Sequence, residues 1–321
     1  MSKETIIITG ASGEIGQNLI EAFSKNNHYN IVAIDLRESE NKIKNCNYII
    51  GDILDDDLIS SLHDQYYITS IFHLAAMLSS KAELNPDLAF KINVQGTVNF
   101  MELALAQTYK NSYVTKFFFP SSIAVYNNNN NDNNVPLSES MYCNPLTIYG
   151  QHKLYCENLG IAFDRYGNEL KDKIDFRCIR FPGIISANTL PIGGTSDYLP
   201  EMVNAAINKK NYTCFVNKGT ILPFIVMPDA ILAILTLMNA DKKKLSQHCY
   251  NISSFSPTIL DVYQKLLQKN SDFKLNYNID NKRQKIVNSW PDFIDDHQAR
   301  SDWGWSPKYS FEQAFSNYLL K

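Results

Sequence analysis

Tyr149 and Lys153 are the residues whose types and spacing point most directly to chemistry. They stand four apart in a segment that we predict to be a helix beginning near Thr147, so their side chains project from one face. A phenol, with a pKa of about 10, is a poor base at neutral pH, and a neighbouring cation favours its ionised form. The pair therefore indicates a general base, Tyr149, tuned by Lys153. The alternative is two surface residues on a helix.

A serine at the end of a predicted strand completes the set of catalytic candidates. Residues 116–119, a lysine followed by three phenylalanines, predict a buried strand, and Ser122 lies just beyond it. Open α/β sheets bind ligands at the carboxyl ends of their strands. We expect the Ser122 hydroxyl to orient a substrate hydroxyl and to stabilise negative charge that develops on it.

The element that must position these groups begins at the first strand. Residues 6–9 are apolar and β-branched, and Gly10, Gly13 and Gly16 follow at a spacing of three before a helix-like segment, 15–23. Glycines in such a strand-to-helix turn allow a tight bend and let the backbone approach a dinucleotide pyrophosphate at the helix N-terminus. The pattern predicts a dinucleotide site, with an ordinary glycine-rich turn as the alternative.

Two acids follow at places where such a site needs them. Asp35 ends the second predicted strand, 30–35, where a carboxylate accepts both hydroxyls of an adenosine ribose and repels a 2′-phosphate, which favours NAD over NADP. Arg37 tempers this preference because it can pair with such a phosphate, or it is a solvated loop cation. Asp52, after the third strand, 48–50, either reaches the adenine amine or caps the next helix, 55–62. The positive ring of an oxidised nicotinamide would further favour the Tyr149 phenolate.

The next strand and helix line the same edge of the sheet. A fourth strand, 71–74, leads into Ala75 and Ala76, whose small side chains let the backbone lie against a cofactor. We interpret His73, inside this apolar run, as a core histidine. Asn93 lies within a predicted helix, 86–109, where an asparagine is intrinsically unfavourable, so we expect it to bond a neighbouring loop or water.

Composition limits the class of protein. The 321 residues are 45% apolar and 20% charged, with a formal net charge of −3, which predicts neither a nucleic-acid nor a membrane partner. The first strand follows Met1 at once, so we expect a cytoplasmic protein without a leader. Six scattered cysteines and six histidines show no ligand spacing, so no metal is expected. The asparagine-rich run 127–134 predicts an exposed loop without chemistry.

Taken together, these motifs resemble the extended short-chain dehydrogenase/reductase family over essentially the whole chain. The resemblance implies an α/β fold, a Rossmann doubly wound parallel sheet of about seven strands with a smaller C-terminal α/β substrate lobe. It also implies bound NAD, and a homodimer formed through the helices that carry Asn93 and Tyr149. We expect residues 1–183 to form the NAD-binding domain, with 224–253 returning to it, and residues 184–223 and 254–321 to form the substrate lobe. In that lobe we expect helices near 202–207, 257–268 and 311–320, with strand-like pieces between the last two.

Several segments are similar to the L-threonine 3-dehydrogenases of this family: 121–126, 181–186, 193–198, 222–230, 289–296 and 300–305. Ile123 and Ala124 follow Ser122 where nucleotide-sugar dehydratases carry an acidic pair, which argues against dehydration. No arginine lies between Arg180 and Arg283, which disfavours a site for a sugar diphosphate.

The resemblance implies NAD-dependent oxidation of the L-threonine β-hydroxyl to 2-amino-3-oxobutanoate, which a coenzyme A-dependent ligase then uses. Asp197 either meets the substrate ammonium or caps a helix, and Trp290 either contacts the substrate or is a core aromatic. A nucleotide-sugar epimerase, or a non-catalytic NAD-sensing protein, remains an alternative. The implied substrate-binding positions are Ser79, Ser122, Tyr149, Gly194, Thr195 and Trp290. The cofactor-binding positions are Gly10, Gly13, Glu14, Ile15, Asp35, Leu36, Arg37, Asp52, Ile53, Leu74, Ala75, Ala76, Asn93, Tyr149, Lys153 and Ile184.

Overall fold

The core of the protein is a parallel sheet of seven strands in the order β10-β6-β5-β4-β1-β2-β3. The computed structural model describes residues 3–25, 28–39, 42–128, 135–165, 173–187, 189 and 193–320. The sheet confirms the predicted Rossmann fold. Its strands are β1 (Thr5–Thr9), β2 (Asn30–Asp35), β3 (Cys46–Ile50), β4 (Ile68–His73), β5 (Lys116–Ser122), β6 (Asp175–Phe181) and β10 (Cys249–Asn251).

The strand order reverses at β1, which lies between β2 and β4. All five residues of β1 are buried, and Ile7 and Ile8 enter apolar clusters on opposite faces of the sheet, as expected for a strand covered on both sides. Doubly wound sheets bind their ligands at such a reversal, which here lies at the carboxyl ends of β1 and β4.

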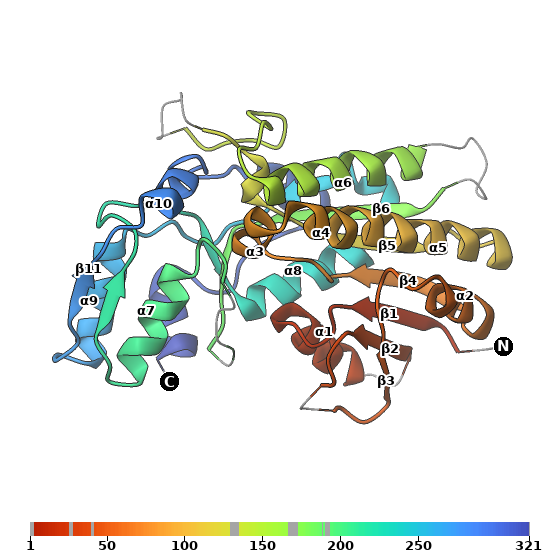
Figure 1. The fold of residues 1–321 in the computed structure, drawn as a ribbon, viewed down its shortest axis with the longest axis horizontal. Helices are drawn as coiled ribbons and strands as arrows, with labels where there is room; N and C mark the ends of the chain where they lie inside the picture. The colour runs from red at the N-terminus through yellow and green to blue at the C-terminus, as the bar shows by residue number, and fades with distance from the viewer. Residues whose placement is uncertain are drawn as a thin grey trace.

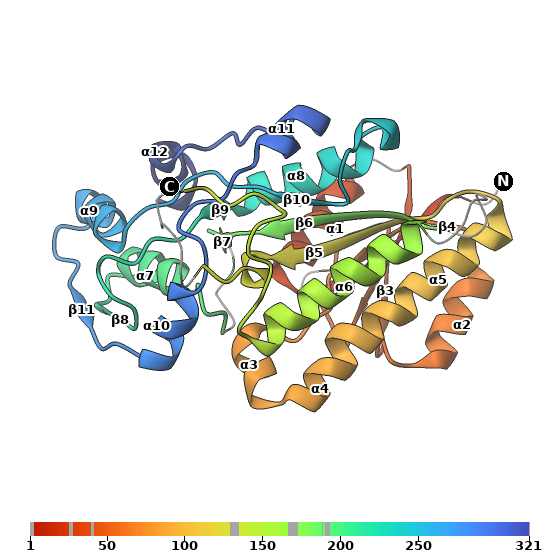
Figure 2. The same ribbon diagram turned by 90° about the horizontal axis from the view of Figure 1, so that it is seen from above.

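Helices cover both faces of this sheet (Figures 1 and 2). On one face lie α2 (Asp56–Gln65), α5 (Gly96–Asn111) and α6 (Ile148–Arg165), which bury Leu62, Phe100 and Cys156 in a common cluster. On the other lie α1 (Glu14–Ser24) and α8 (Met227–Asn239), which bury Leu19 and Leu237.

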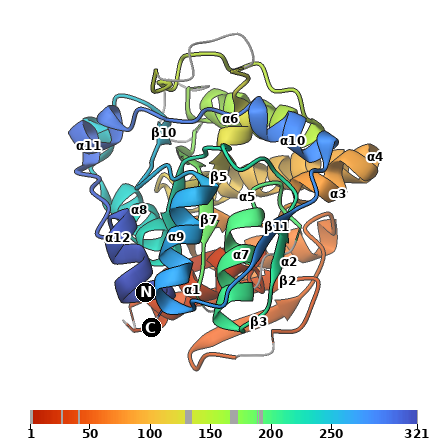
Figure 3. The same ribbon diagram turned by 90° about the vertical axis from the view of Figure 1, so that its left-hand side faces the viewer.

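A smaller α/β lobe adjoins the carboxyl end of the sheet, and Figure 3 shows it from its outer side. Its own apolar core includes Met202, Phe224, Leu266 and Trp290. Its elements are β7 (Gly183–Ile185), α7 (Tyr198–Ile207), β8 (Tyr212–Cys214), β9 (Phe224–Val226), α9 (Ile259–Lys269), β11 (Leu275–Tyr277), α10 (Asn281–Asn288) and α12 (Phe311–Ala314), which a π-helical turn, Phe315–Leu319, extends. The domain boundaries that we predict stay a proposal. β10 joins the main sheet, and α11 (His297–Trp303) packs Trp303 on Tyr250 of β10 with ring centroids 5.9 Å apart.

The predicted helix 86–109 is confirmed: the chain is helical throughout it, as α4 (Pro86–Phe90), a π-helical turn (Lys91–Gln95) and α5, and a separate helix, α3 (Ser79–Leu84), precedes it. Two other expectations about the elements were wrong. The region between α9 and α12 contains two helices, α10 and α11, and only one strand, β11. At the start of the asparagine run, Asn128 is buried and donates its N–H to the Ser289 carbonyl, so this residue is not in an exposed loop; residues 129–134 lie outside the described residues.

Within the described ranges, no helix is long and apolar enough to span a bilayer.

Candidate functional site

The turn after β1 fits a dinucleotide phosphate. Gly10 has a φ of +64°, and a Cβ there would lie 2.7 Å from the Ala75 nitrogen, so only glycine suits this position. Gly13 is the N-cap of α1 and supplies no side-chain cap, which leaves the first N–H groups of the helix open to a ligand. Glu14 and Ile15, the next two predicted residues, form the start of α1.

The predicted ribose acid is held in place by backbone. The Asp35 carboxylate accepts from the N–H of Ser12 at 3.0 Å and from that of Arg37 at 3.1 Å. The Arg37 side chain is 71% exposed, with its Nε 3.9 Å from Asp35 Oδ1, and Leu36 is 63% exposed beside it. The carboxylate is therefore fixed, whereas the arginine is free to turn.

The loop after β3 shows whether Asp52 caps the next helix, which is one of the two roles that the sequence leaves open for it. The helix cap is Asp55, which accepts from the N–H groups of Asp57 and Leu58, so the alternative of Asp52 as the cap is wrong. Asp52 instead accepts from the Leu54 N–H at 3.0 Å. Ile53 is buried, and a Cβ on Gly96 would overlap its side chain, so Ile53 packs against α5. Contact of Asp52 and Ile53 with the adenine stays a prediction.

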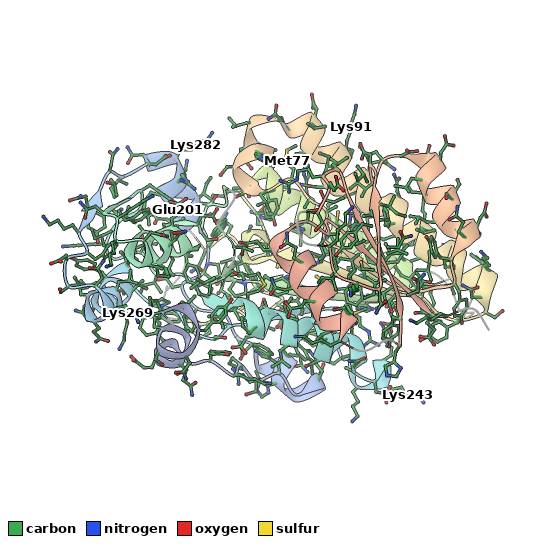
Figure 4. All side chains as sticks on the ribbon, turned by 90° about the horizontal axis from the view of Figure 1, so that it is seen from below. Met77, Lys91, Glu201, Lys243, Lys269 and Lys282 are labelled. Carbon is green, nitrogen blue, oxygen red and sulfur yellow. The ribbon has the colours of Figure 1, made fainter. Side chains whose placement is uncertain are left out.

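The loop 74–78 is fixed from two sides. The Thr9 hydroxyl oxygen accepts from the N–H groups of Leu74 and Ala75 at 3.1 and 3.2 Å. Asn93, in the π-helical turn, accepts from the Met77 N–H at 2.7 Å and donates to the Met77 carbonyl at 3.0 Å. This confirms that Asn93 bonds a neighbouring loop, and its contact with the cofactor stays a prediction. Figure 4 labels Met77 beside the segment of α3 and α4. Ala76 lies between these two anchors.

His73 is a core residue, as we predicted. It is 1% exposed, and its Nδ1 lies 3.0 Å from the Thr9 hydroxyl. Burial, with a smaller effect of Lys153, lowers the pKa of His73 to about 3, so the ring is neutral at physiological pH.

Tyr149 and Lys153 share one face of α6, as their spacing predicts. Lys153 Nζ lies 5.5 Å from the centroid of the Tyr149 ring and 4.5 Å from that of Phe119, and it donates to the Pro120 carbonyl at 2.6 Å. Burial lowers the pKa of Lys153 to about 8. Burial also raises the pKa of the Tyr149 phenol above its ordinary value. The expectation that Lys153 and an oxidised nicotinamide together lower this pKa stays a prediction, because burial is the cause that acts on the phenol in the protein alone.

The end of β5 lies against the start of α6. The half-buried Ser122 hydroxyl accepts from the Ala124 N–H at 3.1 Å and keeps its own proton to donate. A Cβ on Gly150 would lie 2.2 Å from the Ala124 carbonyl, so the glycine after Tyr149 lets the two backbones meet. The fold thus places Ser122 on the segment that packs against the Tyr149 turn.

The predicted substrate residues of the two halves of the protein also meet. Ser79 Oγ, at the start of α3, lies 3.1 Å from Thr195 Oγ1, and both residues are buried. Asp197 is the N-cap residue of α7, as the capping alternative expects, but its carboxylate makes no side-chain cap and accepts instead from the N–H groups of Gly193 and Gly194. We call residues 193–197 the substrate loop.

Two further predicted positions are placed by the lobe. Trp290 is 6% exposed within the lobe core, in agreement with the core alternative, and its contact with substrate stays a prediction. Ile184 is half-buried on β7, where it pairs with Ile225 of β9.

Arg283 is the residue that reasoning from the sequence missed. It lies on α10, and its Nη2 donates to the Gly194 carbonyl at 2.8 Å. The sequence has no arginine between Arg180 and Arg283, so Arg283 is the first arginine of the predicted lobe, and this was the signal that could have identified it.

Arg180, at the other end of this interval, is buried in an ion pair with Glu157 that has two hydrogen bonds, of 2.9 and 2.6 Å. The same glutamate lies within 4.8 Å of the buried thiols of Cys178 and Cys249, a grouping that the scattered cysteines did not suggest.

A doubly wound sheet with a glycine turn at its switch point and an acid ending the second strand defines a dinucleotide-binding α/β enzyme. Residues 6–253 match the model of the NAD dependent epimerase/dehydratase family, and the chain belongs to this family. Its cofactor is NAD.

Relatives and solved structures agree with this assignment. An uncharacterized epimerase/dehydratase of Staphylococcus aureus is 38% identical over 95% of this chain and 92% of its own length. A monomeric L-threonine 3-dehydrogenase from a metagenome database superposes with a TM-score of 0.87 at 36% identity, covering 98% of this chain and 97% of that one. L-threonine dehydrogenase from Clostridium difficile superposes with a TM-score of 0.87 at 30% identity, covering 99% and 97%. These structures confirm the resemblance drawn from the motifs.

Proposed function

We propose that this enzyme oxidises the β-hydroxyl of L-threonine to give 2-amino-3-oxobutanoate. The observation that carries the proposal is the pairing of Ser79 with Thr195, because it provides a small set of buried hydroxyls at the junction of sheet and lobe. Hydroxyls and backbone N–H groups suit the carboxylate of one amino acid. The similar structures that are named as threonine dehydrogenases, at 30–36% identity, support the same substrate.

Each catalytic candidate has a role that its surroundings support. Tyr149 takes the proton from the substrate hydroxyl, and Ser122 holds that hydroxyl with the proton it keeps free. Lys153 stabilises the phenolate and binds the cofactor ribose. The turn of Gly10 and Gly13 and the Asp35 carboxylate would hold NAD, which would supply the acceptor for the hydride that leaves the substrate Cβ. Holding both reactants in place supplies much of the rate acceleration.

The proposal also includes the use of the product and the oligomeric state of the enzyme. 2-Amino-3-oxobutanoate would pass to a coenzyme A-dependent ligase that releases glycine. A homodimer through α6 and the helical segment that carries Asn93, which begins with α4, is supported by large apolar side chains left exposed there: Leu88, Phe90 and Tyr155.

A nucleotide-sugar epimerase is the main alternative within the family. A UDP-glucose 4-epimerase from Thermotoga maritima superposes with a TM-score of 0.84, but its 20% identity supports the shared fold alone. A sugar diphosphate needs several cations. Arg180 is already paired with Glu157, which leaves Arg283 as the arginine that the structure shows beside the substrate loop.

The deciding experiment is absorbance at the NADH band with L-threonine, D-threonine, L-allo-threonine and serine as separate substrates. We expect L-threonine to give the largest kcat/KM. Turnover of UDP- or GDP-sugars without net NADH would replace this proposal with the epimerase. Binding of NAD without turnover of any of these compounds would replace it with a sensing role.

A further inference from the structure

Arg283 contacts the substrate loop through its backbone. Its Nη2 donates to the Gly194 carbonyl at 2.8 Å, across 89 residues of sequence. The guanidinium carbon lies 3.5 Å from the centroid of the Phe215 ring, so the planar group is stacked as well as bonded. Asp280, the N-cap of α10, accepts from the Arg283 N–H and thereby fixes the first turn of the helix that carries it.

The peptide that Arg283 holds is also held by Asp197. The Asp197 Oδ2 accepts from the Gly193 N–H at 2.8 Å and from the Gly194 N–H at 2.5 Å. A Cβ on Gly194 would lie 2.6 Å from the Asp197 carboxylate, so a side chain at this position would displace that carboxylate. The acid therefore binds the N–H groups of the loop, and the arginine binds its carbonyl.

The residue after this peptide carries the contact with the other half of the molecule. Thr195 Oγ1 lies 3.1 Å from Ser79 Oγ at the start of α3. At the other end of α3, Glu83 Oε1 accepts from the Tyr149 N–H at 3.4 Å. A displacement of the Gly194 carbonyl would move the Thr195 hydroxyl relative to both α3 and the catalytic tyrosine.

We propose that Arg283 is a positioning residue, which fixes the backbone of Gly194 so that the Thr195 hydroxyl is held ready for the amino-acid substrate. This inference rests on the proposed function for its substrate. The inference gives α10 a part in substrate binding, although this helix lies outside residues 6–253, which match the family model. It assigns α10 no contact with the cofactor.

The test compares Arg283→Met, which removes every donor, with Arg283→Lys, which restores one, and with Lys282→Met as the matched control. Lys282 is the exposed neighbouring cation on the same helix, labelled at the outer edge of the lobe in Figure 4. We expect Arg283→Met to raise KM for L-threonine by about tenfold with kcat within about threefold, because one charge-assisted hydrogen bond is lost. Arg283→Lys should recover part of the loss. NAD affinity should be unchanged in all three variants.

A second measurement does not depend on the substrate. Amide hydrogen exchange in the substrate loop should be faster in Arg283→Met than in the wild type or Lys282→Met. If the wild type fails to oxidise L-threonine, the proposed function fails, and exchange still tests the positioning role. Equal KM and equal exchange in Arg283→Met and Lys282→Met would overturn the inference. A loss of NAD affinity together with a large fall in Tm in Arg283→Met would also overturn it, by showing general structural damage.

Discussion

Ser79 Oγ lies 3.1 Å from Thr195 Oγ1, although 116 residues separate them along the chain. This contact joins α3, beside the main sheet, to the substrate loop of the lobe. We expect Ser79→Ala and Thr195→Val each to raise KM for L-threonine by up to about tenfold, which is the scale of one hydrogen bond. The double variant should lose less than the product of the two effects, because both changes remove the same interaction.

Steady-state kinetics on the two single variants and the double variant check this coupling. Ser80→Ala, which alters the neighbouring serine of α3, is the control and should leave KM unchanged. Independent, fully additive effects would show that the two hydroxyls do not act as a pair.

Tyr149→Phe should lower kcat by about a thousandfold or more while NAD binding stays nearly intact. Burial raises the pKa of this phenol, so we expect the proton transfer to depend on the Lys153 ammonium, 5.5 Å from the ring centroid, and on the positive charge of an oxidised nicotinamide. Stopped-flow or steady-state formation of NADH measures the loss, and titration of NAD by fluorescence measures binding. Tyr155→Phe, on an exposed position of the same helix, is the control. Retained turnover in Tyr149→Phe would refute the assignment of the base.

The main sheet could be predicted from the sequence because its strands contain continuous buried runs of β-branched or aromatic residues, such as 6–9 and 117–119. The short helix α10 could not be predicted in this way. It consists largely of polar residues, and its stability depends on the Asp280 cap and on packing of Val287 in the lobe core. Local pattern carries little information about such an element.

The same division holds for the site. Asp35 and Asn93 were predictable because each lies at a fixed offset within a motif or breaks a helical pattern. Arg283 and Gly194 are 89 residues apart and meet only in the folded protein, so their contact could not be predicted from the spacing of residues in the sequence. Burial decides the pKa of Tyr149, and the sequence shows the neighbouring lysine but not the loss of solvent.

Asp35→Ser should shift cofactor preference from NAD toward NADP. The carboxylate is fixed by two backbone N–H groups where it would repel a 2′-phosphate, and the exposed Arg37 is free to pair with that phosphate once the repulsion is gone. We expect kcat/KM for NAD to fall by about tenfold or more, the scale of a lost charge-assisted hydrogen bond, and that for NADP to rise.

The added variant Asp35→Ser/Arg37→Gln separates the two causes. It should keep the loss for NAD and lose the gain for NADP. An unchanged ratio of the two kcat/KM values in Asp35→Ser would show that Asp35 does not read the ribose.

We expect the protein to form a homodimer through α6 and the helical segment that carries Asn93, which begins with α4. Phe90 is 50% exposed and Tyr155 is 51% exposed on these helices, an apolar area that a second copy could cover. Light scattering should give about twice the chain mass of 36.6 kDa. Phe90→Glu should shift the mass to that of one chain, whereas Leu260→Glu, at an equally exposed leucine of α9, should not. A single-chain mass at every concentration would exclude the dimer and would match the monomeric state named for the metagenomic L-threonine 3-dehydrogenase.

Asp292→Asn should stabilise the protein at neutral pH and not in acid. Burial raises the pKa of Asp292 to about 6, so between its ordinary value and pH 6 the folded state holds this proton more tightly than the unfolded state does. The stability that this carboxyl contributes is therefore greatest below about pH 4, falls as the pH rises to 6, and stays low above it. The side chain is half-exposed, and solvent screening reduces the expected gain at pH 7.5 to about 1 kcal/mol, or about 2 °C in Tm.

Thermal unfolding at pH 7.5 and at pH 4 measures this difference directly. Asp272→Asn removes the same charge from an exposed loop position and should change Tm little at either pH, which separates burial from net charge. Because Asp292 lies two residues after Trp290, the same variant also reports on the substrate side of the lobe. If the ionised carboxyl assists substrate binding, KM for L-threonine should rise in Asp292→Asn although the variant has a higher Tm at pH 7.5. An equal gain in Tm at pH 4 and at pH 7.5 would contradict the burial argument. At pH 4 the Asp292 carboxyl of the folded wild type is already neutral, so the substitution removes no buried charge there.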